Sequence, residues 1–401
     1  MMDTQNTPVH IRLWHRDFWF LAVANLLLTM AVYMQYVSVA HWMEEAGMPQ
    51  NMIGWAMGIY ALGLFSLGAF CSYLVQQHRR NRVCIRAIFW LALCLALPVF
   101  LLGVPGMDAS AMMVWVRWAT GAVFGLAQMV LSSTLVIDTC EAHQRTEANY
   151  AAAWFGRFAL SLGPLLAMVL LPRVGFTQTI WVAVALTLAA MVLISMAHFP
   201  FRTPEDNVHL LSLDRFLLPG AWGLLVNLVI VTTVLGMVLA LHRDSVTFFA
   251  FLMLGFLLAV LAEKFVFVNA ELKSETVTGL LLMAFALMLL FTERQTIPFV
   301  VPVLVGLSMG LVGSRFLLFF IKLSHHCQRG TSQSTFFLAW ETGIALGLGI
   351  GWGDLPVLLD EALQLGSAQK ALLLAGLMLI VLAMAMYVCF THQWYLKHKN
   401  R

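Results

Sequence analysis

Long apolar runs separated by short polar segments dominate the sequence. Runs of spanning length lie near residues 18–40, 53–76, 85–104, 112–137, 148–171, 178–197, 219–241, 246–267, 275–292, 297–321, 332–353 and 369–391. Each is close to the roughly 20 residues that an α-helix needs to cross a bilayer. Helices are required because isolated strands leave backbone groups unpaired in lipid, and the runs lack the alternation of barrel strands. The sequence therefore predicts an all-α membrane protein with twelve transmembrane helices.

Composition supports a lipid environment. Hydrophobic residues make up 61% of the chain and charged residues only 11%, whereas soluble domains carry about 25% charged residues. The net charge of +3 is too small to indicate a nucleic-acid partner. The six Cys residues are scattered in or beside apolar runs without CxxC spacing, so we interpret them as free thiols. We expect no metal or cofactor, and no enzyme, because P-loop, HExxH and Ser-His-Asp patterns are absent from the loops.

The basic residues of the loops predict the orientation. One side collects most of them, including Arg79, Arg80 and Arg145, whereas the other side holds Arg173, Arg243, Arg294 and Lys370. Positive charge marks the cytoplasmic side, so both termini are predicted to lie in the cytoplasm, in an inner (plasma) membrane. The first apolar run is too long for a signal peptide and is interpreted as a retained span.

A polar connection divides the chain into two halves. Residues 199–218 contain FRTPEDN and form the longest predicted cytoplasmic loop. They separate a six-helix bundle in residues 1–198 from a second in residues 219–401. The segment DLPVLLDEALQLG, at residues 354–366, is predicted to form a short surface helix.

The two halves contain a short internal repeat. RTEANYAAAWFGRFALSLGP begins at Arg145, and RGTSQSTFFLAWETGIALGLG begins at Arg329. In both, Leu-Gly follows seventeen and eighteen positions after the Arg. The alignment sets Arg157 opposite Glu341, each about 18 Å from the cytoplasmic Arg and so near the bilayer centre. The repeat predicts two pseudo-symmetric bundles, an arrangement known from transporters.

Several local motifs are similar to those of the major facilitator superfamily. RWATGAVFG, from Arg117, is similar to the family's RxxxGxxxG helix, and Leu162–Pro164 reads LGP like its Gly-Pro motif. Arg79 and Arg80 stand where the family has two basic residues, although the preceding Gly, Asp and Gly are replaced by Cys71, Val75 and His78. The resemblance implies a monomeric alternating-access transporter. It also implies a gating role for a set of residues: Arg79, Arg80, Asp138, Arg145, Arg329, Gly163 and Pro164.

Ionisable residues within spans are costly in lipid and indicate function. Glu341 is the candidate for proton coupling, and a structural ion pair is the alternative. Arg157 either pairs with Glu341 or binds an anionic substrate. Arg117 either contacts substrate or bonds to polar groups of the first span. Arg315 either lines the cavity or extends towards the cytoplasm.

Uncharged polar residues add further candidates for substrate binding. Asn25 and Asn227 occupy similar places in the two halves, and Thr29, Tyr33 and Gln35 follow Asn25 on the first span. Hydrogen bonds between helices are the alternative explanation for all of them.

The balance of these charges favours one class of solute. Three arginines against one carboxylate leave the interior positive, so we predict a secondary transporter of a small polar or anionic solute, coupled to protons. Two alternatives remain open. The 23 Met and 28 Phe residues would also suit multidrug efflux, and a membrane receptor or enzyme that transports nothing is the alternative of another class.

Overall fold

A computed structural model describes residues 12–101, 109–141, 143–199, 209–292, 296–325 and 328–399. Every regular element in these ranges is helical, and no β-strand is present there. The predicted all-α fold class is confirmed. The FRTPEDN part of the linker, Arg294 and Cys327 fall outside the described residues. The other cysteines, Cys71, Cys84, Cys94, Cys140 and Cys389, are free thiols as predicted.

The helices follow the predicted apolar runs closely. Before the linker they are α1 (Arg16–Glu45), α2 (Gln50–Ser66), η1 (Gly68–Phe70), α3 (Cys71–Gln77), α4 (Arg80–Leu101), α5 (Ala109–Val130), the π-helical turn η2 (Leu131–Leu135), α6 (Val136–Asp138) and α7 (Arg145–Met196). After the linker they are η3 (Pro219–Ala221), α8 (Trp222–Leu241), α9 (Val246–Phe265), α10 (Leu272–Leu290), α11 (Ile297–Leu323), α12 (Arg329–Trp352), α13 (Leu355–Leu363), α14 (Ala368–Met386), the π-helical turn η5 (Tyr387–Thr391) and α15 (His392–His398).

The number of spans depends on how two bent elements are counted. Ten helical segments of the described chain are long and apolar enough to cross a membrane, and the pair α12–α13, bent by 63°, makes eleven. α7 has 52 residues, more than twice the length of one span, and its backbone leaves the helical region at Gly175. The two spans predicted there lie on either side of this glycine. The exact number of twelve stays a prediction, whereas the surface helix predicted at residues 354–366 is present as α13.

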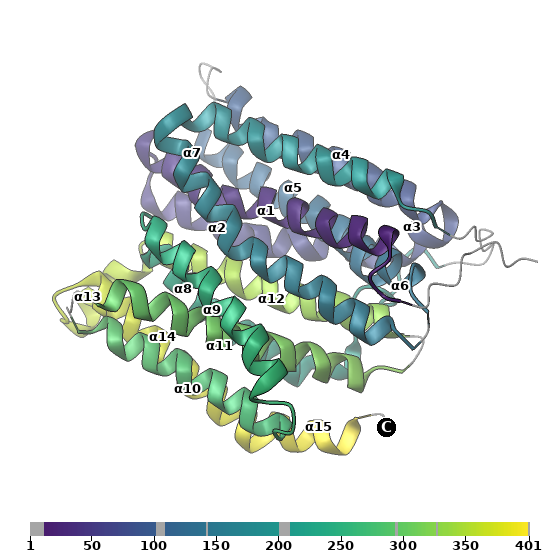
Figure 1. Cartoon of the computed structure of the whole chain (residues 1–401). Helices are drawn as coiled ribbons and strands as arrows, with labels where there is room; N and C mark the ends of the chain where they lie inside the picture. The colour runs from purple at the N-terminus through teal and green to yellow at the C-terminus, as the bar shows by residue number, and fades with distance from the viewer. Residues whose placement is uncertain are drawn as a thin grey trace, which may run out of the picture.

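The helices run side by side and fall into two groups. Figure 1 shows α1 to α7 packed together on one side and α8 to α15 on the other, with α2 and α12 near the boundary between them. The start of α1 and the C-terminal α15 lie at the same end of the bundle. We call this the termini end, and the end at which α13 lies the α13 end.

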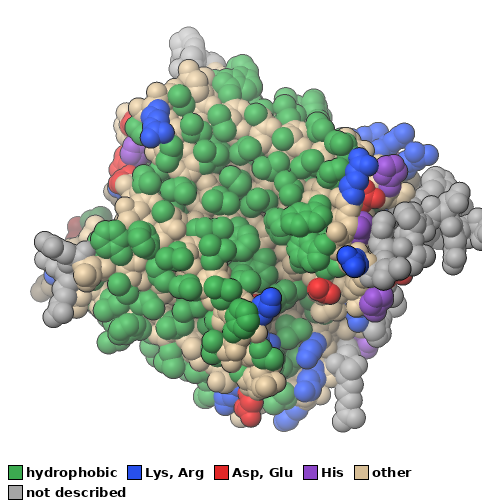
Figure 2. Space-filling view, in the orientation of Figure 1, with side chains coloured by type: hydrophobic (Ala, Val, Ile, Leu, Met, Phe, Trp, Pro, Cys, Tyr) green, Lys and Arg blue, Asp and Glu red, His purple; other side chains and the backbone are tan. Residues whose placement is uncertain are grey.

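The outer surface suits a bilayer. Figure 2 shows hydrophobic side chains over the middle of the visible face, with most of the charged side chains towards the two ends. Large apolar side chains such as Leu62, Trp90 and Phe390 are exposed. In water this exposure would be unfavourable, but in lipid it needs no further cover.

Two repeated glycines show why the halves resemble each other. A Cβ on Gly163 of α7 would lie 2.8 Å from the carbonyl oxygen of Met30 in α1. A Cβ on Gly347 of α12 would lie 2.0 Å from the carbonyl oxygen of Thr233 in α8. Each glycine therefore allows the fifth predicted helix of its half to touch the first. The Leu-Gly match in the sequence corresponds to an equivalent close approach in the structure.

The halves also touch each other at both ends of α12. At the α13 end, a Cβ on Gly54 of α2 would lie 2.6 Å from the Cα of Gly353. At the termini end, a Cβ on Gly330 would lie 2.4 Å from the carbonyl oxygen of Ser133 in η2. The part of α12 between these contacts faces a cavity.

Candidate functional site

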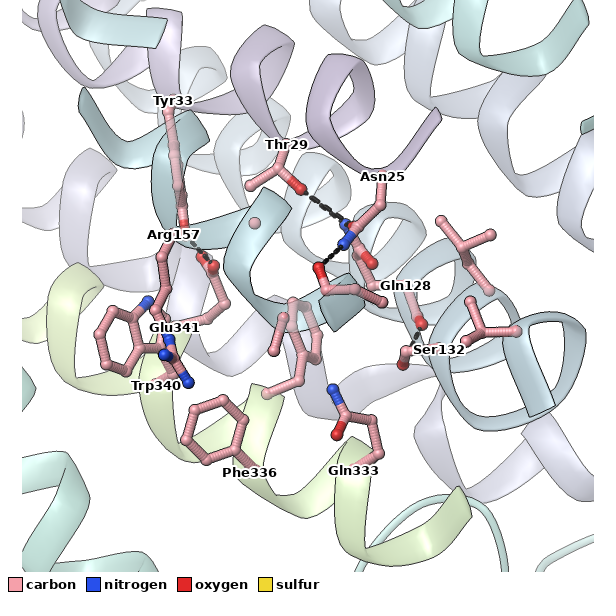
Figure 3. A pocket seen from close by; sticks show the side chains of 16 residues that line it. Asn25, Thr29, Tyr33, Gln128, Ser132, Arg157, Gln333, Phe336, Trp340 and Glu341 are labelled. Carbon is pink, nitrogen blue, oxygen red and sulfur yellow. Dashed lines mark hydrogen bonds between the residues drawn. The ribbon is translucent and has the colours of Figure 1, made fainter. Parts of the chain in front are cut away.

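A cavity lies between the two halves, with about 570 Å³ of empty space that includes its part open to solvent. Its walls come from α1, α5, η2, α6, α7 and α12. Figure 3 shows two groups of polar side chains in it: Arg157 and Glu341 gather with Tyr33 and Trp340, while Asn25, Gln128 and Gln333 lie apart from them. The lining residues are Asn25, Thr29, Tyr33, Gln128, Leu131, Ser132, Val136, Ala152, Ala153, Gly156, Arg157, Gln333, Phe336, Phe337, Trp340 and Glu341.

Glu341 is buried on α12 and receives hydrogen bonds from the opposite half. The phenol of Tyr33 in α1 donates to Oε1 (Figure 3). Tyr36 of α1 donates to Oε2 over 3.1 Å, and Tyr60 of α2 donates to the same oxygen over 3.4 Å. Both carboxylate oxygens are therefore occupied. Phenol donors stabilise the charged form of a carboxylate, so this cluster holds α12 against α1 and α2.

An ion pair between Arg157 and Glu341 is one of the two predictions for Arg157, and the structure does not contain this pair. Its Nη1 donates to Ser314 Oγ over 2.5 Å, and its guanidinium lies 4.5 Å from the centre of the Trp154 ring. The side chain is only 2% exposed, yet Nε and Nη2 have no hydrogen-bond partner. Arg157 therefore lines the cavity and retains two buried donors without partners.

The second polar group consists of carboxamides. Gln128 Nε2 donates to Asn25 Oδ1 over 2.9 Å and to Thr29 Oγ1 over 2.8 Å. Asn25 Nδ2 donates to the carbonyl oxygen of Ala152 over 2.8 Å. Asn25 thus both lines the cavity and bonds between helices. Gln333 of α12 is 5% exposed, and its Oε1 is buried without a partner.

Arg117 lies behind the tyrosines and does not line the cavity. Its Nη1 donates to Gln35 Oε1 of α1 over 3.0 Å, which is the bond to the first span that the sequence predicted as one alternative. Its guanidinium carbon lies 5.0 Å from the ring centre of Tyr60 and 5.9 Å from that of Tyr36. The cation therefore supports the rings whose hydroxyls reach Glu341.

Two further candidates lie away from the cavity lining. Arg315 forms an ion pair with Glu275 of α10, whose side chain is fully buried, and it is not among the residues that line the cavity. Asn227 donates to the carbonyl oxygen of Ala383 over 2.9 Å, a bond between α8 and α14. Both have structural partners instead of open access to a solute.

The predicted gating residues lie mainly at the termini end. Arg80, at the start of α4, forms an ion pair with Asp138 at the end of α6, and Arg79 is its neighbour in the chain. Arg145 is the first residue of α7 and Arg329 is the first residue of α12, so the repeat begins at equivalent places. Pro164 lies inside α7 beside Gly163.

Several site residues are not predicted from the sequence. Tyr36, Tyr60, Gln128 and Gln333 carry no charge, and nothing in a single sequence separates them from ordinary packing residues. One signal is available: Tyr33 and Tyr36 are three residues apart and so share a helix face. No group of His, Cys, Asp or Glu able to hold a metal ion occurs in the described part of the chain.

Comparisons with known proteins agree with this architecture. The sequence model described as "Major Facilitator Superfamily" matches residues 21–348. The POT family transporter PepTSo has a similar structure, with a TM-score of 0.69, 11% identity, and coverage of 96% of this chain and 99% of that one. The nucleoside transporter NupG has a TM-score of 0.65 and 11% identity, with coverage of 93% of this chain and 100% of that one. The human organic anion transporter MFSD10 has a TM-score of 0.62 and 14% identity, with coverage of 92% of this chain and 98% of that one. No curated protein sequence matches. The chain is a multi-pass membrane protein, and it belongs to the major facilitator superfamily.

Proposed function

We propose that the chain is a secondary transporter that moves a small polar or anionic solute by alternating access and couples this movement to protons. One observation supports an anion. Arg157 keeps two buried donors without partners, whereas both oxygens of Glu341 already accept hydrogen bonds. A buried cation with unused donors favours an anion, and a carboxylate whose two oxygens both accept hydrogen bonds has less to offer a cation.

The position of Glu341 supports proton coupling. Its three phenol donors belong to α1 and α2, so the cluster joins the two halves. A protonated carboxyl group has one fewer acceptor for these hydroxyls, which weakens the contact. Protonation would thus favour separation of α12 from α1 and α2. The proton and the movement of the halves are coupled through the same bonds.

A ligand screen tests the proposed solute class. Purified full-length protein is heated with small organic anions, uncharged polar solutes or lipophilic cations, because a ligand stabilises the state that it binds. We expect anions to raise the Tm, Arg157→Gln to abolish this shift, and Arg157→Lys to keep part of it. Stabilisation by lipophilic cations alone would instead support multidrug efflux.

A variant of Glu341 tests the coupling. Glu341→Gln keeps the shape of the side chain but cannot release a proton. In proteoliposomes we expect this variant to exchange a transported anion across the membrane, yet to lose accumulation driven by a pH gradient. Proton-driven accumulation that survives the substitution rules out this coupling role.

Orientation and organisation complete the proposal. We propose a monomer in the inner membrane with both termini in the cytoplasm, and two bundles, residues 1–198 and 219–401, joined by the linker 199–218. The basic residues of the termini end, among them Arg79, Arg80 and Arg145, support this orientation. A reporter fused after Arg401 that is active only outside the cytoplasm should remain inactive. Labelling of the cavity from both sides separates a transporter from a receptor or enzyme, which would never alternate its access.

A further inference from the structure

Buried polar atoms without partners mark two separate walls of the cavity. One wall is lined by Arg157, whose Nε and Nη2 are buried without partners and can only donate. On the other is Oε1 of Gln333, which can only accept. Buried polar atoms are usually hydrogen-bonded, so each wall lacks a complementary group. A ligand that fills both needs an anionic acceptor at one end and a hydrogen-bond donor at the other.

The surface between these walls is aromatic. Gln333, Phe336 and Trp340 share one face of α12, and Phe336 lies between the other two in Figure 3, with Arg157 beside Trp340. Gln333 and Trp340 are seven residues apart, which is about 10 Å along a helix. The rings of Phe336 and Trp340 lie 5.9 Å apart with an angle of 32° between their planes. A flat apolar body about as long as this face would pack against both rings.

The charges of the lining limit the ligand to one negative group. Arg157 is the only Lys or Arg and Glu341 the only Asp or Glu among the lining residues. The two amide hydrogens of Gln128 are taken by Asn25 and Thr29, so this side chain has no donor left for another anion. A second carboxylate placed near Gln333 would be buried without a cation to pair with, which is unfavourable.

We infer that the solute is an elongated aromatic monocarboxylate with a hydroxyl or amino group at its far end, and that Gln333 is a specificity-determining residue. The carboxylate binds Arg157, the ring packs on Phe336 and Trp340, and the distal group donates to Gln333. This inference rests on the proposed transport of an anion and narrows it to one chemical class.

Three probes of similar size test the class. Binding of 4-hydroxyphenylacetate, phenylacetate and 4-hydroxyphenethyl alcohol to the purified full-length protein is measured by quenching of tryptophan fluorescence, to which Trp154 and Trp340 contribute. We expect 4-hydroxyphenylacetate to bind about tenfold more tightly than either analogue, because each analogue leaves one buried group of the protein unpaired. Equal binding of 4-hydroxyphenylacetate and phenylacetate overturns the inference, as does binding of none of the three.

Variants assign each end of the ligand to its residue. Gln333→Leu should remove the preference for the hydroxyl group and leave the preference for the carboxylate, whereas Arg157→Gln should do the reverse. Gln333→Met repeats the first test if the Leu variant does not fold. Gln328→Leu, on the residue before α12 and outside the cavity lining, is the matched control and should retain both preferences.

The two proposals fail in different ways. If organic anions bind through Arg157 but neither the hydroxyl group nor Gln333 affects the affinity, the specificity is wrong and anion transport stands. If lipophilic cations bind and no organic anion does, the proposed function is wrong as well.

Discussion

The three tyrosines that reach Glu341 are not equivalent. Tyr33 alone donates to Oε1, whereas Tyr36 and Tyr60 share Oε2, with Tyr60 at the longer distance of 3.4 Å. Removing the hydroxyl of Tyr33 leaves one oxygen of a buried carboxylate with no donor. Removing that of Tyr60 leaves Oε2 with the bond from Tyr36. The Tyr33 hydroxyl is therefore the one on which the cluster depends most.

This difference predicts an order of stability among three Tyr→Phe variants. Tyr33→Phe should lower the free energy of unfolding by about 1.5–3 kcal/mol, the range for a hydrogen bond to a charged group. Tyr60→Phe should lower the free energy of unfolding by clearly less than Tyr33→Phe does. Tyr73→Phe, in α3 and outside the cluster, is the control. Thermal unfolding of the purified variants measures the order, and equal losses at Tyr33 and Tyr60 would contradict it.

The ion pair of Arg315 and Glu275 predicts a structural rather than a transport defect. Glu275 is fully buried, so removing its partner leaves a charge without compensation. Arg315→Gln should cost about 3–5 kcal/mol of stability, whereas the double variant Arg315→Met with Glu275→Leu should recover most of this loss. Thermal unfolding measures both. Anion affinity of any folded variant should be unchanged, because the pair lies outside the cavity lining. A large change in affinity would show that the pair contributes to anion binding.

The depth of these charges could be predicted from the sequence, but their partners could not. Counting residues from Arg145 and Arg329 places Arg157 and Glu341 at the level of the cavity, because rise along a helix is constant. Counting gives no rotation between helices, so it could not show that Glu341 faces tyrosines and Arg157 faces Ser314. Those partners come from other helices, and their selection depends on how the two halves pack.

At the level of elements, the end of the linker connects the two halves. Residues 212–218 run across the termini end, and Arg215 adopts a left-handed backbone conformation there (φ 58°). Asp214 accepts hydrogen bonds from Thr331 of α12 over 3.0 Å and from Ser72 of α3 over 3.4 Å. Other bonds of this segment reach Ala69 and Thr134 on one half and Thr335 on the other. The segment therefore holds α3 and α12 together.

Loss of Asp214 should loosen this end of the bundle. Cys71, the neighbour of Ser72, is fully buried and should become more accessible when the segment is released. We expect Asp214→Ala to increase the labelling rate of Cys71 by a membrane-permeant maleimide about two- to tenfold, in line with the loss of one or two ordinary hydrogen bonds. Mass spectrometry of the Cys71 peptide measures the rate.

The chain provides controls for this labelling. Cys389 is exposed and is replaced by Ser to remove its signal. Burial raises the pKa of the Cys140 thiol, in the loop before α7, to about 11, so this thiol stays protonated at neutral pH and reacts slowly. Asp244→Ala changes an exposed carboxylate in the loop before α9 and should leave the labelling rate of Cys71 unchanged. An unchanged rate in Asp214→Ala would show that the segment does not hold the two halves together.

The hydrophobic runs predict where the helices lie, but they do not predict the π-helical turns within them. The ends of α1, α8 and α12 lie close to the predicted boundaries because apolar length and flanking polar residues define a span. The π-helical turns η2 and η5 lie inside such runs and change only the hydrogen-bond register, which leaves no trace in hydropathy. η2 matters because it places Leu131 and Ser132 in the cavity wall.

The whole molecule has its two halves in contact on both sides of the cavity. At the α13 end the backbones of Gly54 and Gly353 meet, and at the termini end Gly330 meets Ser133. Alternating access requires these contacts to open in turn, because a cavity open at both ends would be a channel. In the proposed mechanism the two halves would move as rigid bodies, with α12 as the helix shared by both contacts.

Glycine substitutions should bias this equilibrium in opposite directions. A methyl group on Gly54 collides with Gly353 and should favour the state open at the α13 end, whereas a methyl group on Gly330 should favour the state open at the termini end, each by about tenfold or more. Pulsed spin-label distances between positions 50 and 355 should lengthen in Gly54→Ala and not in Gly330→Ala. Gly223→Ala, where a Cβ meets nothing within 4 Å, is the control. A shift in the same direction for both variants would contradict alternating contacts, because only movement about the central cavity makes the two ends oppose each other.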